Sequence, residues 1–302
     1  MMSKRMTKRA LRLLSIHARD GEDTIDYIKF FKSLDSEERL NRYVSEFMGT
    51  RTAYSEAKSL PNGMIAFQFA SGDANEVVSY YDLEEKIQRS VDQTNGFFST
   101  PVWIIVSPSE RLLAKEIRRP GVSDKALETY FEQYSRDRLG FKQPRFSLNP
   151  VPDKDFIKRL DGLEIIKRVD ITLNQPNYDW GDSESRITAM AEESGASTAT
   201  LSMTAKPKQS LEKDKGIVQD VEHIIKSGVI GPIKKIVIKG NQTAGEPEQT
   251  LNQKNYQRQV VTSFPSEAED VDKFDRISSA GAQLIEDAVA DKSDKEGGIL
   301  AD

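Results

Sequence analysis

The chain of 302 residues contains no cysteine and only two histidines, His17 and His223. The absence of cysteine excludes disulfide bonds, thiol catalysis and metal centres built on thiolates. Two histidines so far apart in the sequence leave little material for a multi-histidine metal site. We therefore expect no metal ion and no other cofactor. A chain without cysteine also fits a reducing cytoplasm, which is the compartment that we expect.

Long apolar runs and the common catalytic motifs are also missing. The most continuous apolar run, Val102 to Val106, is long enough only for a buried strand. The basic N-terminal segment has an apolar stretch that is interrupted by Arg12 and lacks the cleavage site of a secretory signal. Glycine-rich phosphate loops, the Gly-x-Ser-x-Gly elbow and the His-Glu-x-x-His motif do not occur. These absences favour a protein that does not span a membrane and is not an enzyme.

Apolar residues recur with the period of strands in some segments and with the period of helices in others. The expected strands are 10–17, 64–69, 102–106, 111–117, 163–173, 199–205, 233–239 and 257–262. The expected helices are 24–34, 37–48, 123–138, 182–194, 211–227 and 267–290, with a further helix start at Asp153. This order predicts an α+β fold of two mixed α/β domains with mainly antiparallel sheets.

The chain is long enough for two domains. Two prolines within Asn149-Pro150-Val151-Pro152 interrupt both helices and strand ladders, so we place the domain boundary there. The expected parts are an N-terminal domain over 1–149, a C-terminal domain over 150–290 and a flexible tail over 291–302. A domain inserted into another remains an alternative.

Three local patterns are more specific. The strands 102–106 and 111–117 flank Ser107-Pro108-Ser109-Glu110, which predicts a hairpin. Ser123 has the position of an N-cap for the helix that follows. The polar stretch 241–252 is typical of a long exposed hairpin loop.

The net charge of −5 conceals a strong segregation of charge along the chain. Residues 1–19 carry six basic and no acidic side chains, and residues 111–168 carry fourteen basic and nine acidic ones. Residues 20–110 and 246–302 are strongly acidic. A protein that is acidic overall can therefore present a basic face.

The basic groups of the middle and late segments predict phosphate contacts. Along the strand 111–117, Arg111 and Lys115 share a face with Leu113 and Ile117, so the cations are not simply the solvent side of an alternating strand. A scattered distribution that only keeps the protein soluble is the alternative that the sequence leaves open. The predicted DNA-binding residues are Arg111, Lys115, Arg118, Arg119, Arg136, Arg138, Lys142, Arg145, Lys158, Arg159, Lys167, Arg168, Lys234, Lys235 and Lys239.

Two other functions compete with DNA binding. A metal-dependent nuclease would use Asp153, Asp155, Glu164 and Lys167, although the Glu164-x-x-Lys167 spacing puts carboxylate and amine on opposite faces of a strand. A protein-interaction module would use the acidic segments to bind a basic partner. Tyr178 and Trp180 could stack on bases, but their acidic neighbours favour an anchoring role.

The order of these elements resembles the RexA family of phage exclusion proteins over most of residues 25–290. The first pointer is the run Asn95-Gly96-Phe97-Phe98-Ser99-Thr100-Pro101-Val102-Trp103-Ile104-Ile105-Val106, followed by Pro120-Gly121 and a helix. The second pointer is Val169-Asp170-Ile171-Thr172-Leu173, then Val221-Glu222-His223-Ile224-Ile225, Ile236-Val237-Ile238-Lys239-Gly240 and Thr243-Ala244-Gly245-Glu246. The chain departs from the family in its basic N-terminal extension and in its acidic isoelectric point.

The resemblance implies a two-domain, homodimeric protein that binds double-stranded DNA with little sequence preference. It also implies a role in abortive infection, an antiviral defence, together with a membrane protein, as RexA acts with RexB. RdgC-like DNA-binding proteins are a more distant analogue. The resemblance implies no catalytic residues.

Overall fold

The computed structural model describes residues 5–21, 23–73, 78–81, 84–86, 88–91, 96–174, 198–226, 233–243 and 245–298. The chain divides into two compact units that alternate along the sequence. Unit 1 comprises Met1–Leu11, Ala18–Phe146 and Val261–Ala282, and unit 2 comprises Arg12–His17, Ser147–Val260 and Gln283–Asp302.

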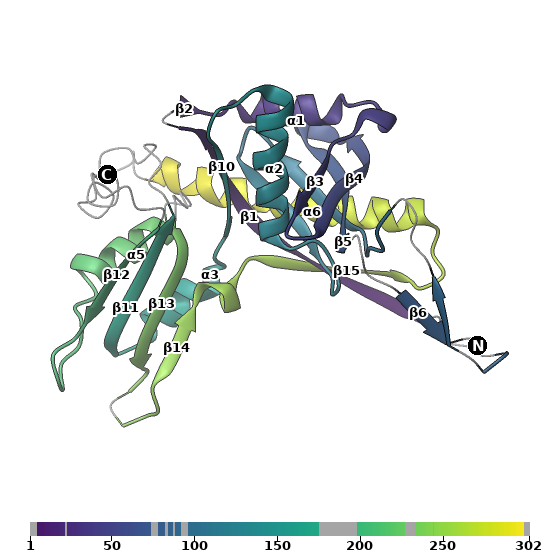
Figure 1. Cartoon of the computed structure of the whole chain (residues 1–302). Helices are drawn as coiled ribbons and strands as arrows, with labels where there is room; N and C mark the ends of the chain where they lie inside the picture. The colour runs from purple at the N-terminus through teal and green to yellow at the C-terminus, as the bar shows by residue number, and fades with distance from the viewer. Residues whose placement is uncertain are drawn as a thin grey trace. The chain divides into compact units, whose positions relative to one another are not determined.

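The elements confirm the predicted α+β fold with mainly antiparallel sheets (Figure 1). The strands are β1 Met6–Asp20, β2 Asp23–Thr24, β3 Val44–Phe47, β4 Thr50–Ser59, β5 Ile65–Asp73, β6 Val78–Tyr81, β7 Gln88–Val91, β8 Val102–Ser107, β9 Leu112–Ile117, β10 Pro144–Pro150, β11 Ile165–Asn174, β12 Thr198–Thr204, β13 Ile233–Asn241, β14 Gln249–Asn252 and β15 Gln259–Pro265. The α-helices are α1 Tyr27–Asp35, α2 Asp124–Leu139, α3 Lys154–Asp161, α5 Gly216–Lys226 and α6 Asp270–Gly298. Short 3-10 turns span Arg39–Asn41, Pro61–Gly63 and Gln253–Tyr256.

The main sheet has the strand order β10-β1-β9-β8-β5-β4-β3, and β15 and β2 also pair with β1. One face of its unit 1 portion packs against α1 and α2 through an aromatic core. Phe131 of α2 lies 5.7 Å from Phe31 of α1 and 6.0 Å from Phe69 of β5, measured between ring centroids. Edge-to-face ring pairs of this kind add to the stabilisation from area burial. This core fixes both helices on the sheet.

The other face of the sheet in unit 1 packs against α6. A Cβ atom placed on Gly281 would lie 2.7 Å from Ile105 Cδ1 of β8, so a larger residue here would require the Ile105 side chain to shift. Near the start of α6, the ring of Phe274 lies 4.6 Å from that of Trp103. Trp103 is 8% exposed, in agreement with the buried strand predicted for residues 102–106.

Unit 2 contains a four-stranded antiparallel sheet with the order β12-β11-β13-β14 (Figure 1). The helices α3 and α5 contribute Phe156, Leu160, Val218 and Val221 to a core that covers one face of this sheet. The sheet contributes the remaining core residues, among them Ile166, Val169, Ile171, Ile236, Ile238 and Leu251. Since side chains alternate along a strand, the residues between these positions lie on the opposite face.

The local sequence patterns predicted several elements correctly. The hairpin of β8 and β9 is confirmed, with Val106 opposite Leu113. The N-cap at Ser123 is confirmed, because its side chain accepts a hydrogen bond of 3.0 Å from the backbone N–H of Ala126. Asp153 likewise caps α3.

The predicted helix over 37–48 is wrong. The segment contains a 3-10 turn and the edge strand β3, which pairs with β4 through a two-residue turn at Met48 and Gly49. Both turn residues have positive φ angles, 51° and 83°, as tight hairpin turns of this type require. The predicted loop over 241–252 also includes the short strand β14.

The tail that we expected to begin at residue 291 is helical up to Gly298, where α6 ends. The expected helix 182–194, Tyr178 and Trp180 lie outside the described residues. In the portions of the chain that are described, no helix combines the length and the apolar character that crossing a bilayer requires.

Candidate nucleic-acid interface

The face of the unit 2 sheet opposite its core carries a group of the predicted cations. We call this the outer face; on β11 and β13 it consists of Arg168, Asp170, Thr172, Lys235, Val237 and Lys239. These residues alternate with the buried core residues of the same two strands, and Arg168 and Lys235 are exposed. The outer face is therefore a polar surface held in place by the apolar core behind it.

Strand register sets the arrangement of the outer face. Arg168 lies opposite Lys239, although the two residues are 71 positions apart in the sequence. Thr172 lies opposite Lys235, and Asp170 lies opposite Val237. The neighbouring strands extend these pairs into three rows, namely Thr204-Arg168-Lys239-Thr250, Ser202-Asp170-Val237-Asn252 and Thr200-Thr172-Lys235.

Asp170 is the carboxylate within these rows, and it interacts with the cations beside it. Arg168 Nε lies 2.9 Å from Asp170 Oδ1 and 3.0 Å from Oδ2. Partial burial opposes ionisation of Asp170, but hydrogen bonds from Ser202 and Arg168 and the charges of Arg168 and Lys239 outweigh it and lower the pKa of this carboxyl group. One negative charge thus orients Arg168, and the face retains an excess of positive charge.

Two further cations lie at irregularities of the same sheet. Lys167 occupies a register shift in β11, and its Nζ lies 3.6 Å from Glu248. Lys234 is exposed and lies at a second register shift, next to Lys235. Such β-bulges redirect side chains.

Lys158 and Arg159 do not share the outer face. Both are exposed residues of α3, which packs on the core face of the sheet, and Lys158 Nζ lies 3.1 Å from Asp155. The core of unit 2 therefore lies between these two cations and the outer face. Lys158 and Arg159 thus do not share one surface with the cations of β11 and β13.

The remaining predicted cations belong to unit 1. Lys115 is a correction to the predicted set, because it is only 3% exposed and its Nζ lies 2.8 Å from Asp124. It shares a face with Leu113, as the alternation predicts, but α2 covers that face. An external phosphate could reach Lys115 only by displacing this ion pair.

Other unit 1 cations make contacts within the protein. Arg111 lies in the turn between β8 and β9, with its guanidinium carbon 5.1 Å from the centre of the Tyr27 ring. Arg118 is partly buried and donates to the carbonyl oxygen of Pro101 at 3.0 Å. Arg138 donates to Asn41 O at 3.0 Å. The remaining four, Arg119, Arg136, Lys142 and Arg145, are exposed.

The residues of the competing nuclease hypothesis do not form one group. The Asp153 side chain contacts the backbone of Asp155, whereas Glu164 and Lys167 contact other residues. Asp153 caps α3, Asp155 pairs with Lys158, and Lys167 pairs with Glu248. The backbone N–H of Glu164 donates to Gln242 O at 3.4 Å. Within the described ranges, no three acidic or histidine side chains group in a way that could hold a metal ion.

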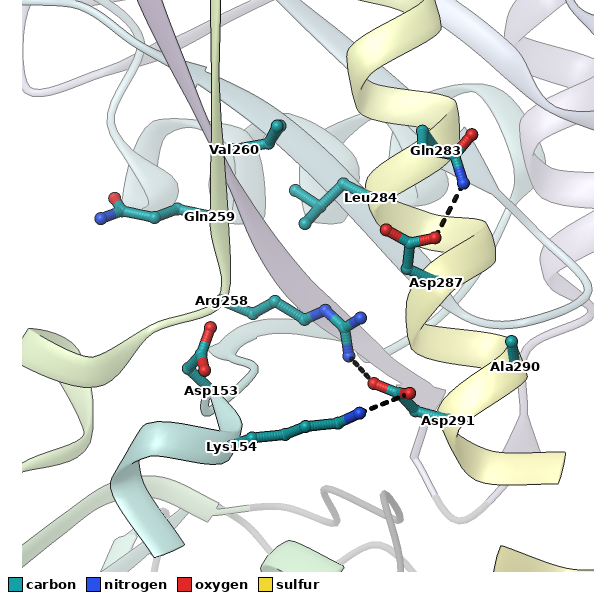
Figure 2. A pocket seen from close by; sticks show the side chains of 10 residues that line it. All are labelled: Asp153, Lys154, Arg258, Gln259, Val260, Gln283, Leu284, Asp287, Ala290 and Asp291. Carbon is teal, nitrogen blue, oxygen red and sulfur yellow. Dashed lines mark hydrogen bonds and ion pairs between the residues drawn. The ribbon is translucent and has the colours of Figure 1, made fainter. Parts of the chain in front are cut away.

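A second polar feature of unit 2 is a cavity of about 460 Å³ between α3, β15 and the C-terminal half of α6 (Figure 2). Arg258 and Lys154 converge on Asp291 there, each at 2.8 Å. Asp287 accepts a hydrogen bond of 2.7 Å from Gln283. Because its cations are already paired with Asp291, we interpret this cavity as an anchor for α6.

We expect Asp291→Asn to lower the free energy of unfolding at pH 7 by about 1–2 kcal/mol, since it weakens two charge-assisted hydrogen bonds. Partial burial opposes ionisation of Asp291, but Lys154 and Arg258 outweigh it and lower the pKa of the carboxyl group. A lowered pKa stabilises the fold above the pKa of the unfolded state, about 3.9, and this stabilisation is lost as the pH falls through the folded-state value. Urea unfolding at several pH values should show the difference between the two proteins shrinking below about pH 4.

Asp287→Asn is the matched control for this prediction. Asp287 lies on the same helix and accepts its hydrogen bond from the neutral Gln283, which an asparagine oxygen can also accept. We expect little change in unfolding free energy for the control. Equal losses in both variants, or a loss for Asp291→Asn that does not depend on pH, would contradict the anchoring role.

Sequence reasoning missed the hydroxyl side chains of the outer face. Thr200, Ser202 and Thr204 project from β12 and alternate with apolar residues, and Thr172 Oγ1 lies 3.2 Å from Thr200 Oγ1. The alternation of hydroxyl and apolar residues over 198–204 was the signal that could have revealed this face. Hydroxyl groups are common donors to phosphate oxygens.

A family model described as "Domain of unknown function (DUF4747)" matches residues 7–279. The matched range begins in β1 and ends within α6, so it includes the outer face and the core behind it. No curated protein matches the chain.

Proposed function

The chain belongs to the DUF4747 family, and from that premise we propose that it is a non-enzymatic protein that binds double-stranded DNA through the outer face of unit 2. The observation that carries the proposal is the register of β11 and β13. It puts Arg168 beside Lys239 in one row and Lys235 in another, on an exposed face with hydroxyl groups on both flanks. Arginine, lysine and hydroxyl side chains are the usual partners of DNA phosphates.

The spacing of the two cationic rows suits a duplex. Arg168 and Thr172 mark the rows and are four residues apart along β11, which corresponds to about 13 Å. The major groove of B-form DNA is about 12 Å wide. The rows can therefore contact phosphates on both sides of one groove.

The chemistry of the face favours binding without sequence preference. Among the described residues of the three rows, none is aromatic, so the face offers no platform on which bases could stack. Contacts to phosphates position a protein on DNA but do not read its sequence. Affinity should then depend on salt and on duplex geometry.

The resemblance to the RexA family supplies the biological setting of the proposal. In this setting two copies of the chain bind one duplex in the cytoplasm as part of a phage-exclusion system. A membrane protein acts as the partner. The exposed unit 1 cations Arg119, Arg136, Lys142 and Arg145 would add less specific attraction to DNA.

We expect two short duplexes of unrelated sequence to bind the full-length protein with equal affinity. Fluorescence anisotropy at about 50 and about 200 mM salt should show affinity falling by at least about 40-fold, because three phosphate contacts give a logarithmic slope of about −2.7. A clear preference for one duplex, or binding that does not change with salt, would reject the proposal.

The same preparation distinguishes the two competing functions. Plasmid DNA incubated with the protein and Mg²⁺ or Mn²⁺ should remain uncut, whereas cleavage would favour the nuclease hypothesis with Asp153, Asp155, Glu164 and Lys167. No binding to any duplex at low salt would favour the protein-interaction module. In that case the acidic segments 20–110 and 246–302 become the surfaces to test.

A further inference from the structure

Unit 1 contains a cleft of about 500 Å³ that the proposed DNA binding does not use. It lies on the face of the main sheet that α6 covers, next to the first turns of that helix. Residues of β1, β4, β5, β8, β9, β15 and α6 line it. We call it the Glu116 cleft after the carboxylate at its base. Its volume falls in the range typical of small-molecule sites.

Glu116 is 2% exposed and has hydrogen-bond partners on both oxygens. Its Oε2 accepts from the backbone N–H of Trp103 at 3.1 Å, and its Oε1 lies 3.0 Å from Arg9 Nε. Arg118 Nε lies farther away, 3.9 Å from Oε1. One carboxylate thus faces two guanidinium groups, which leaves a net positive charge at the base of the cleft.

The two guanidinium groups are held close together at some energetic cost. Burial, and then the positive charge of Arg9, lower the pKa of Arg118, and the charge of Glu116 offsets this only in part. Burial also raises the pKa of Glu116. Arg118 uses Nη1 to hold the carbonyl oxygen of Pro101, and its side chain is 30% exposed. An incoming anion would relieve the repulsion between Arg9 and Arg118.

Part of the wall beside these charges is apolar. Phe274 packs on Trp103, and Ile277 of α6 also lines the cleft. Lys58 Nζ lies 4.0 Å from the centre of the Phe274 ring and 3.1 Å from Glu56. The cleft therefore combines a cationic base with an aromatic and aliphatic side, a combination that suits an anion on an apolar stem.

We propose that the Glu116 cleft binds a small organic anion, a carboxylate or phosphate attached to an aromatic or aliphatic group. Arg9 and Arg118 bind the anionic group, and the apolar part lies along Phe274 and Ile277. Arginine matches both anions because its planar fork donates two parallel hydrogen bonds. This site is independent of the outer face in unit 2, so either proposal can fail without the other.

The test uses phenyl phosphate and benzoate as probes, with inorganic phosphate and benzyl alcohol as comparisons. Binding is measured by calorimetry on the full-length protein and by Trp103 fluorescence in a Trp180→Phe background. We expect saturable binding of both organic anions, weaker binding of inorganic phosphate and none of benzyl alcohol. Arg118→Ala should weaken binding about tenfold or more, since it removes a charge-assisted contact. Arg39→Ala, at an exposed 3-10 turn, is the matched control and should change nothing.

Glu116→Gln separates a binding role from a structural one. Glutamine keeps an oxygen for the Trp103 N–H but removes the charge that competes with the ligand, so we expect tighter binding. A purely structural Glu116 would give unchanged or weaker binding, which would overturn the proposal. Absence of binding by both organic anions, or equal binding by Arg118→Ala and wild type, would overturn it as well. Thermal unfolding of each variant identifies those that fail to fold, and Arg118→Lys then replaces Arg118→Ala.

Discussion

Replacing Arg168, Lys235 and Lys239 together by glutamate is expected to weaken duplex binding on the order of a hundredfold at moderate salt. The three residues provide the cationic positions of the outer face, and Asp170 would then have carboxylates in place of its cationic neighbours. The logarithmic salt slope should fall by about one for each phosphate contact that is lost. Anisotropy titrations of the variant at several salt concentrations measure both effects.

A second triple variant with the same change in net charge is the control for this result. Lys158, Arg159 and Arg145 are exposed, and none of them lies on the outer face. Replacing these three by glutamate should reduce affinity only modestly, through the weaker long-range attraction. Equal losses in the two triple variants would show that binding is spread over the whole surface, and the outer face would lose its assigned role.

The register of unit 2 explains why the sequence identified the cations but not their arrangement. Arg168 and Lys239 meet because β11 pairs with β13, and the intervening chain contains β12 and α5. Such non-local pairing depends on how both strands bury their apolar faces together. A single sequence predicts which side chains of a strand share a face, but it does not predict which other strand pairs with it.

The alternation of side chains along a strand also explains the error at Lys115. The sequence correctly put Leu113, Lys115 and Ile117 on one side of a strand, whereas Arg111 lies in the turn before it. It did not reveal that α2 would cover the middle of that side. Lys115 consequently pairs with Asp124 in the first turn of α2. Local signals such as the Ser123 cap were reliable, because the groups that make them are neighbours in the sequence.

The predicted helix over 37–48 failed because its apolar residues have a helical period without a surface to cover. Leu40 is 96% exposed and Phe47 is 50% exposed, so the apparent stripe buries little. Pairing of β3 with β4 and the tight turn at Met48 and Gly49 determine this segment instead. Tertiary pairing overrides periodicity where the periodic face is not buried.

The second large effect that we expect concerns the aromatic core of unit 1. Phe131→Ala should lower the free energy of unfolding by about 3–5 kcal/mol, the usual range for a buried phenylalanine. Phe131 is 1% exposed, and its ring centroid lies 5.5–5.7 Å from those of Phe30, Phe31 and Phe146. Urea unfolding followed by Trp103 fluorescence in a Trp180→Phe background reports on this unit, because Trp103 belongs to β8 of the same sheet.

Phe47→Ala removes the same atoms from an edge strand of the same sheet, where the side chain is half exposed. The change should cost much less than Phe131→Ala, since little area is buried there and no cavity forms. The contrast tests whether α1 and α2 are held on the sheet by the aromatic core or mainly by polar contacts around it. If Phe131→Ala unfolds at nearly the same urea concentration as Phe47→Ala, the polar contacts are what mainly holds α1 and α2 on the sheet. One of them is the hydrogen bond from Tyr54 to Leu34 O, at 2.6 Å.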